Sequence, residues 1–494
     1  MAFLTEAANR GSIGGYDIDN SLKLEADNSE YMKRVMTATG NRKTFTISVW
    51  LKRTELQAGA GSVYGHTFFL GGNGGTGTAV HLTFKTGTPN SDALLFKINT
   101  GTFNVTNRVF RDTSAWYHIV LAVDTTQATA SDRLKLYVNG VQETSFATIN
   151  YPTQNSDTQN NFFQSATYGQ EIGAYDSAGT YYGKFCGYLA EYNHIDGQAL
   201  APTDFGEFDS GSGIWKPKAY EGTYGTNGWY LDFVDAANLG DDVSGNGNNF
   251  TLTNITAADQ ATDTPTNNFC IMNMLNRTNG NIKNQEGGTK VTTDGGSGWC
   301  SMLATMGVTK GKWYWESQRM STGTPNDIIT GIVGSEDAYI PFNTAANYYI
   351  GNVATSSSIG YYQKNYPSQE GSVINGVGLN FFSAPGDTIM FGLDMDNNKM
   401  YFGLNGTWLA TNGTDSIGGN PARASTLHAD FDGEFVLPAV SVFQGNNMTI
   451  NFGGYAAYTI SSAASDANGY GTFEYAPPSG YYALCSKNLA EFGG

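Results

Sequence analysis

The chain has 494 residues, with 27 Lys and Arg against 44 Asp and Glu, which gives a formal net charge of −17. Charged residues make up only 14%, and the 62 glycines are nearly twice the roughly 7% of average proteins. The sparse acidic charge excludes a nucleic-acid-binding protein, which needs clustered Lys and Arg, and the 13% of aromatic residues excludes disorder. No run approaches the roughly 20 apolar residues of a membrane span, so we expect no membrane insertion.

Strand patterns dominate the first half. Residues 44–51 alternate apolar and polar side chains, and residues 116–123 form a nearly continuous apolar run of strand length. Residues 134–138 alternate again and lead into Asn139-Gly140, a pair typical of a two-residue hairpin turn because both residues tolerate positive φ. Helical patterns are rare, and the best is a single turn at residues 201–207, with a proline near its start.

The second half repeats the arrangement of the first. A strand pattern at residues 387–393 is followed by a second at 399–404, which runs into Asn405-Gly406. Short strands with regular turns favour sandwiches over an up-and-down barrel. We therefore predict an all-β protein made of two jelly-roll sandwiches.

The turn-rich stretch between the halves contains one strand pattern, at residues 229–233, and predicts a structured connector that divides the chain. The predicted segments are an N-terminal arm (1–15), a first sandwich (16–208), the connector (209–265), a second sandwich (266–488) and a C-terminal tail (489–494).

Several stretches of each half resemble known families. The first half resembles the LamG-type concanavalin A-like domain, and the matching stretches are residues 42–53, 116–124, 134–142 and 187–200. The second half resembles a SPRY domain, another concanavalin-like jelly roll, and the matching stretches are residues 311–316, 328–334, 386–408 and 435–454. The resemblance implies two concanavalin A-like jelly rolls.

A narrower resemblance is to virion proteins of tailed phages, especially phages of marine bacteria. It is carried by residues 15–25, 205–233, 241–254, 262–270 and 475–491. It implies a non-enzymatic virion protein of the tail fibre, tail tip or capsid-decoration type. Its partners would be other virion proteins, host-surface polysaccharide and further copies of itself, with a trimer expected for a fibre. The start of the sequence shows no signal peptide, which fits assembly in the host cytoplasm and release by lysis.

Loop tyrosines are the candidate glycan-binding residues. Sugars stack their apolar faces on aromatic rings while neighbouring polar groups take the hydroxyls. In the first half, the candidates are Tyr175, Tyr181 and Tyr182, which stand beside Gly, Ser and Asp. In the second half, the loops that SPRY modules use for partners would include Tyr361, Tyr362 and Trp408. A structural role for each ring is the alternative.

Calcium is the metal that the LamG resemblance implies. Such domains often hold one ion at a loop rim through carboxylates and carbonyls, and the candidate ligands are Asp124, Asp176 and Asp196, or Asp17 and Asp19. None shows EF-hand spacing, so solvated surface acids are the alternative. The five histidines show no metal spacing, and His118 is expected to be a hydrogen-bonded histidine inside a strand.

The four cysteines form no CxxC pair, so we expect buried small side chains rather than a zinc site or a disulfide framework. Cys270 opens the second half and Cys485 closes it, and the first and last strands of a jelly roll often pair. These two residues are therefore expected to be neighbours.

An enzyme is the main competing class. Concanavalin-like folds include glucanases, whose carboxylates alternate along a strand, but that motif is missing here. Asp430, Asp432 and Glu434 come closest, because alternation would place them on one strand face. A polar turn before the strand at residues 435–442 is the favoured explanation of these three residues, so we predict a non-enzyme. A purely structural virion component and a bacterial adhesin are further alternatives.

Overall fold

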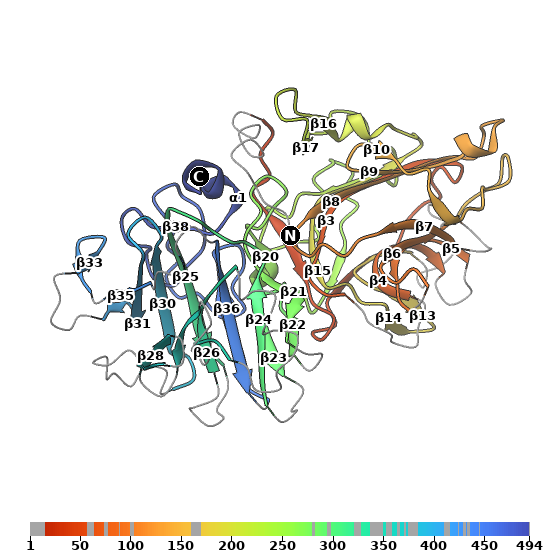
Figure 1. Ribbon diagram of the computed structural model, residues 1–494. Helices are drawn as coiled ribbons and strands as arrows, with labels where there is room; N and C mark the ends of the chain where they lie inside the picture. Colours follow the sequence, from red (N-terminus) through yellow and green to blue (C-terminus); the bar gives the residue numbers. More distant parts are fainter. Residues whose placement is uncertain are drawn as a thin grey trace. The chain divides into compact units, whose positions relative to one another are not determined.

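Strands supply nearly all of the regular structure in the computed structural model. The model describes residues 15–56, 64–73, 78–87, 89–98, 103–159, 169–278, 282–293, 298–320, 328–335, 349–351, 358–362, 366–369, 372–373, 384–409, 415–422, 424–427, 431, 435–443 and 445–493. The chain divides into two units at the boundary between Thr266 and Asn267. Each unit is a sandwich of two large, mainly antiparallel sheets, so the all-β prediction is confirmed (Figure 1).

Two eight-stranded sheets form the first unit. One sheet has the order β10 (Val141–Gln142), β9 (Leu134–Val138), β8 (Trp116–Asp124), β3 (Thr44–Arg53), β15 (Gly187–Asp196), β1 (Ser21–Leu24) and β20 (Gln260–Ala261), with β18 (Trp229–Leu231) also paired to β15. The other has the order β11 (Phe146–Thr148), β7 (Asn104–Val109), β6 (Ala93–Lys97), β5 (Thr78–Lys85), β4 (Tyr64–Asn73), β12 (Gly169–Ile172), β2 (Tyr31–Arg34) and β19 (Thr251–Thr253).

Short elements complete the first unit. They are the ribbons β13 (Tyr175–Ser177) with β14 (Thr180–Tyr182) and β16 (Gly206–Phe208) with β17 (Trp215–Pro217), and the 3₁₀ turns η2 (Ala130–Asp132), η3 (Pro202–Asp204) and η4 (Ala257–Asp259). The η3 turn confirms the single turn predicted at residues 201–207.

The core of the first unit follows from strand alternation. Phe45, Ile47, Val49 and Leu51 of β3 are all buried in one hydrophobic cluster with side chains of β4, β5 and β6 from the opposite sheet. The predicted Asn139-Gly140 turn joins β9 to β10, and both residues have positive φ, 48° and 77°. The pattern of a fully buried strand at residues 116–123 is confirmed as β8.

The second unit contains a seven-stranded and a nine-stranded sheet. The first has the order β21 (Met272–Arg277), β24 (Trp299–Ala304), β36 (Val436–Phe443), β26 (Ile328–Gly334), β27 (Ser358–Tyr362), β28 (Tyr366–Gln369) and β29 (Ser372–Val373). The second has the order β22 (Ile282–Gln285), β23 (Lys290–Thr293), β37 (Asn447–Asn451), β25 (Lys312–Arg319), β30 (Thr388–Asp394), β31 (Lys399–Leu404) and β32 (Thr407–Trp408), with β35 (Ala424–Thr426) paired to β31 and β38 (Tyr482–Ala483) paired to β25. A ribbon of β33 (Ser416–Ile417) and β34 (Asn420–Pro421) and one helix, α1 (Ser486–Phe492), complete the unit.

The repeated hairpin of the second half is also present. β30 pairs with β31, and Asn405-Gly406 then turns the chain into β32 with φ values of 46° and 83°. Side chains of β25, β30 and β36 fill the core between the two sheets.

The structure corrects the prediction that residues 209–265 form a connector between the two sandwiches. It is rich in turns, but β18, β19 and β20 lie within it and pair with β15, β2 and β1 of the first sandwich. Trp229 and Phe250 of the same stretch are buried in the core of that sandwich. The first unit therefore extends to Thr266, and the boundary predicted at residue 208 is wrong.

The structure also corrects the prediction that residues 489–494 form a C-terminal tail. Leu489 and Phe492 belong to α1 and pack against the core of the second unit, and the Phe492 ring stacks on Tyr482 with centroids 3.9 Å apart. Of the predicted N-terminal arm, residues 1–15, only Gly15 lies within the described residues. In the described part of the chain, no helix is long and apolar enough to cross a bilayer.

Candidate functional site

A hairpin on the first unit carries three of the predicted tyrosines. β13 and β14 pair in the register Tyr175 to Tyr182 and Asp176 to Tyr181, and Ala178 and Gly179 form the turn with φ values of 55° and 86°. Tyr175 is only 8% exposed and packs on Leu70 and Ala79 of β4 and β5. Tyr175 thus anchors the hairpin on the sheet. Tyr182 lies opposite Tyr175 on the same face of the ribbon, with ring centroids 5.7 Å apart, whereas Tyr181 and Asp176 lie on the other face.

Tyr181 stacks on a residue that sequence reasoning did not select. The rings of Tyr31 and Tyr181 lie with centroids 4.0 Å apart and planes 19° from parallel. Tyr31 begins β2, and alternation along that strand buries Met32 and Arg34 while Tyr31 and Lys33 are half-buried on the other face. No sequence signal could have found this partner, because about 150 residues separate the two tyrosines.

Charged groups lie beside the stacked rings. The Lys33 ammonium is 3.1 Å from the Glu171 carboxylate, 3.6 Å from that of Asp176 and 5.9 Å from the centre of the Tyr181 ring. Burial alone would lower the pKa of Lys33, but the charge and hydrogen bond of Glu171, together with the charges of Tyr181 and Asp176, outweigh burial, so the pKa of Lys33 is raised. Burial raises the pKa of Glu171. The two carboxylates keep the Lys33 ammonium charged and hold it next to the Tyr181 ring.

We call Tyr31, Lys33, Asp176 and Tyr181 the tyrosine surface. Tyr31 and Lys33 belong to β2 of the large sheet, and Asp176 and Tyr181 belong to the β13–β14 ribbon. The surface combines aromatic rings with a cation and a carboxylate, which are the groups that hold the apolar face and the hydroxyls of a sugar. Tyr182, which is 48% exposed, lies on the other face of the ribbon.

The second-unit candidates lie elsewhere than predicted. Tyr361 is not a loop residue: it belongs to β27, is 2% exposed and packs against Phe402 in the core. Trp408 of β32 is half-buried and lies against the cluster that contains Tyr314. The side chain of Tyr362 lies outside the described residues. The local pattern Tyr361-Tyr362 beside glycine mimics a loop, but pairing with β26 makes it a strand.

The predicted calcium ligands do not converge. Asp124 and Asp196 end β8 and β15, which lie on either side of β3 in one sheet, whereas Asp176 lies on the β13–β14 ribbon. Asp124 accepts hydrogen bonds from Thr126 and Gln127, and Asp196 accepts them from the backbone of Asn41 and Asn227. Among the described residues, none of the three belongs to a group of three acidic, His or Cys ligands. The three aspartates therefore do not come together as one set of ligands, and calcium binding at any one of them stays a prediction.

Two further predictions concern His118 and the acidic residues of the enzymatic alternative. His118 is buried between Trp50 and Trp215, and its two ring nitrogens contact Ser48 at 2.8 Å and Trp215 at 3.0 Å, as predicted for a hydrogen-bonded histidine. Asp430, Asp432 and Glu434, the residues of the enzymatic alternative, lie outside the described residues.

Cys270 and Cys485 lie on adjacent backbone segments. The Cys270 amide donates to Leu484, and Phe269 pairs with Cys485. Because Phe269 and not Cys270 is opposite Cys485, alternation sends the two thiols into different clusters. All four cysteines of the chain are buried thiols, and none forms a disulfide.

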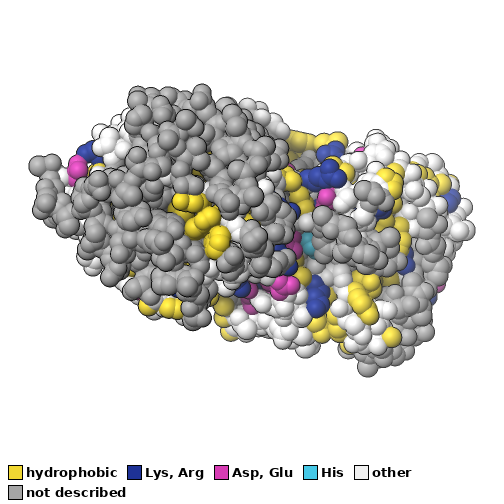
Figure 2. Space-filling model, turned by 60° about the horizontal axis from the view of Figure 1, so that its bottom comes forward, with side chains coloured by type: hydrophobic (Ala, Val, Ile, Leu, Met, Phe, Trp, Pro, Cys, Tyr) yellow, Lys and Arg dark blue, Asp and Glu magenta, His cyan; other side chains and the backbone are white. Residues whose placement is uncertain are grey.

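The exposed hydrophobic side chains are scattered. Figure 2 shows one face, on which the described hydrophobic side chains form separate groups among polar atoms. The exposed large residues among those described are distributed along the chain. Tyr182 lies against Tyr175, and Phe208 lies against Trp215.

Comparison with known proteins supports the fold. Residues 27–182 match the family model described as the concanavalin A-like lectin/glucanases superfamily. The fold of the first unit is therefore concanavalin A-like, and the tyrosine surface lies within the matched residues. A search of curated proteins found no match.

Two solved structures are similar to parts of the chain. The SPRY domain of human HERC1 is 17% identical, with a TM-score of 0.27, and the match covers 36% of this chain and 96% of that one. A second human SPRY domain is 17% identical, with a TM-score of 0.25, and the match covers 35% of this chain and 94% of that one.

Proposed function

We propose that this protein is a non-enzymatic glycan-binding protein whose first sandwich holds sugar at the tyrosine surface. The observation that carries the proposal is the Tyr31–Tyr181 stack, with Lys33 and Asp176 at its edge. The match of residues 27–182 to a lectin and glucanase superfamily supports a carbohydrate as the ligand. Both supports concern the same residues of the chain.

The proposal extends to the setting of the protein. We propose a phage virion component exposed on the particle, in contact with other virion proteins and with further copies of itself, which uses glycan binding for host attachment. This rests on the resemblance of residues 205–233 and 475–491, among other stretches, to virion proteins of tailed phages. If it holds, mass spectrometry of purified particles detects the chain, and recovery only from the soluble lysate contradicts it.

The glycan proposal is tested on an array of bacterial surface polysaccharides, with and without calcium. Retention without release of reducing ends is the expected result. Release of reducing ends would overturn the non-enzymatic assignment and direct attention to Asp432 and Glu434. The absence of both retention and release would favour a purely structural component. Retention should not require calcium, because the predicted aspartates are held by protein hydrogen bonds.

A further inference from the structure

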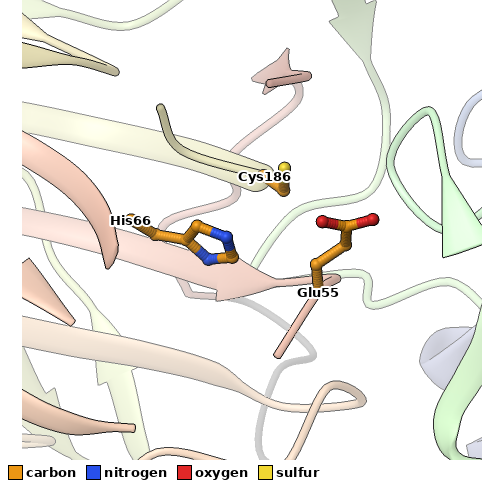
Figure 3. Close-up of side chains that lie close together, drawn as sticks. All are labelled: Glu55, His66 and Cys186. Carbon is orange, nitrogen blue, oxygen red and sulfur yellow. The ribbon is translucent and has the colours of Figure 1, made fainter. Parts of the chain in front are cut away.

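Three potential metal ligands converge at one end of the first sandwich. Glu55 follows β3, His66 lies in β4 and Cys186 precedes β15, and one ligand atom from each lies within 4.8 Å of the others. Figure 3 shows the His66 ring and the Glu55 carboxylate turned toward each other beside the Cys186 thiol. The spacing of the three residues in the sequence does not indicate a metal site, because they lie in or next to three different strands that only the fold brings together.

The state of His66 is the first indication that these three side chains bind an ion. Its side chain is fully buried, yet neither ring nitrogen has a hydrogen-bond partner among the described residues. A buried polar atom without a partner costs roughly 1–3 kcal/mol, so native proteins rarely leave both nitrogens of an imidazole in this state. The other three histidines of this unit, at positions 81, 118 and 194, each have a polar partner for their ring.

The charges around Cys186 are the second sign. The buried thiol donates to Glu25 at 3.5 Å, and the Glu55 carboxylate lies within 4.8 Å of the thiol sulfur. A dication bound here would displace the thiol proton and balance the charge of a thiolate and one carboxylate in this buried place.

We propose that Glu55, His66 and Cys186 form a zinc-binding site. Sulfur, imidazole nitrogen and carboxylate oxygen are the ligands that Zn²⁺ takes in proteins, whereas calcium takes oxygen ligands only. Glu55 is half-buried and gives the ion access from solvent. The Glu25 carboxylate, which accepts the hydrogen bond from the thiol, would serve as a fourth ligand or hold the other ligands in place. The ion would tie together β3, β4 and β15.

The test uses the full chain, stripped with chelator and titrated with Zn²⁺, and in parallel with Co²⁺ as a spectroscopic probe. One zinc per chain and a thiolate-to-cobalt charge-transfer band are expected. Cys186→Ser should abolish the band, and Glu55→Gln should weaken zinc binding by at least about tenfold. Glu55 is half-buried, so this variant is expected to fold even if Cys186→Ser does not.

Cys300→Ser is the matched control, because it removes another buried thiol from the second unit. It should leave both the stoichiometry and the cobalt band unchanged. Absence of stoichiometric zinc, absence of a thiolate band, or a folded Glu55→Gln variant that binds zinc as tightly as the parent would each overturn the site.

Discussion

Lys52 and Asp263 form an ion pair that is sealed inside the first sandwich. The Lys52 Nζ lies 2.7 Å from the Asp263 Oδ2, and the two side chains are 0% and 1% exposed. The indole of Trp116 donates to the other carboxylate oxygen at 3.1 Å. The pair joins β3, near the start of the sandwich sequence, to the segment that composition predicted to be a connector.

Removing one partner of this pair should destabilise the first unit strongly. Asp263→Asn leaves the Lys52 charge buried without its counter-charge, and such losses typically cost about 3–5 kcal/mol. Urea unfolding of the full chain, with hydrogen exchange in β3 as the local readout, measures the change.

Asp157→Asn is its control. The Arg42–Asp157 pair lies at 3.2 Å with Asp157 47% exposed, and exposed pairs contribute about 0–1 kcal/mol. Equal losses in the two variants would contradict the account of Asp263 as a core residue.

The domain boundary gives a second prediction. A fragment of residues 11–266 should fold, because it contains every strand of the first unit. A fragment of residues 11–208 should not, since it lacks β18, β19 and β20 and the buried ring of Trp229. Circular dichroism and urea unfolding compare the two, and cooperative unfolding of the shorter fragment would contradict the revised boundary.

The difference between the predicted and observed boundary has a physical cause. β3, β8, β9 and β31 were predictable because alternation and Asn-Gly turns are local properties. The strand pattern at residues 229–233 is present as β18, but the pattern does not show that it pairs with β15. β19 and β20 have only three and two residues, too few for a periodic pattern, and their strand conformation comes from pairing with distant strands. Composition identifies such a segment as turn-rich but not the sheet that it joins.

Buried histidines should make the first unit sensitive to acid. Burial lowers the pKa of His81, His118 and His194 to about 3 in the folded state, against about 6.5 in the unfolded chain. Between these values the unfolded state binds more protons, so stability falls as the pH falls from 6.5 toward 3. The three histidines therefore contribute a loss of stability between pH 7 and pH 5. Burial raises the pKa of Glu30 and of Glu191 to about 7, so these two groups oppose that loss in the same range, and the histidine contribution has to be read from a variant.

His118→Gln provides the check. The variant is less stable at pH 7, because the contacts to Ser48 and Trp215 are lost, but it should lose less further stability at pH 5 than the parent. The comparison uses urea unfolding at the two pH values with hydrogen exchange in β8. An undiminished loss in the variant would show that His118 does not contribute to the acid response.

Thiol chemistry gives a fourth prediction. All four cysteines are buried thiols, so a thiol reagent should find four thiols per chain in denaturant and react slowly with the native protein after metal removal. A count of two, with a Cys270–Cys485 disulfide found by peptide mapping, would contradict the assignment of these side chains to separate clusters.

The candidate site was only partly predictable. Tyr181 and Tyr182 could be found because a Gly-containing turn between aromatic residues marks an exposed hairpin. Tyr31 and Lys33 could not, because their place beside the hairpin depends on sheet order rather than on any local pattern. Tyr361 illustrates the opposite error, since its polar and glycine neighbours resemble a loop while its ring lies in the core.

One binding comparison decides whether the tyrosine surface binds glycan. The polysaccharide that the parent protein retains is titrated against Tyr181→Ala and against two controls, Tyr182→Ala and Tyr151→Ala, whose rings are 48% and 40% exposed but lie outside the surface. Binding should be roughly tenfold weaker for Tyr181→Ala, about 1.4 kcal/mol, and should change little for Tyr182→Ala and Tyr151→Ala. Unchanged affinity in Tyr181→Ala would contradict glycan binding at this surface.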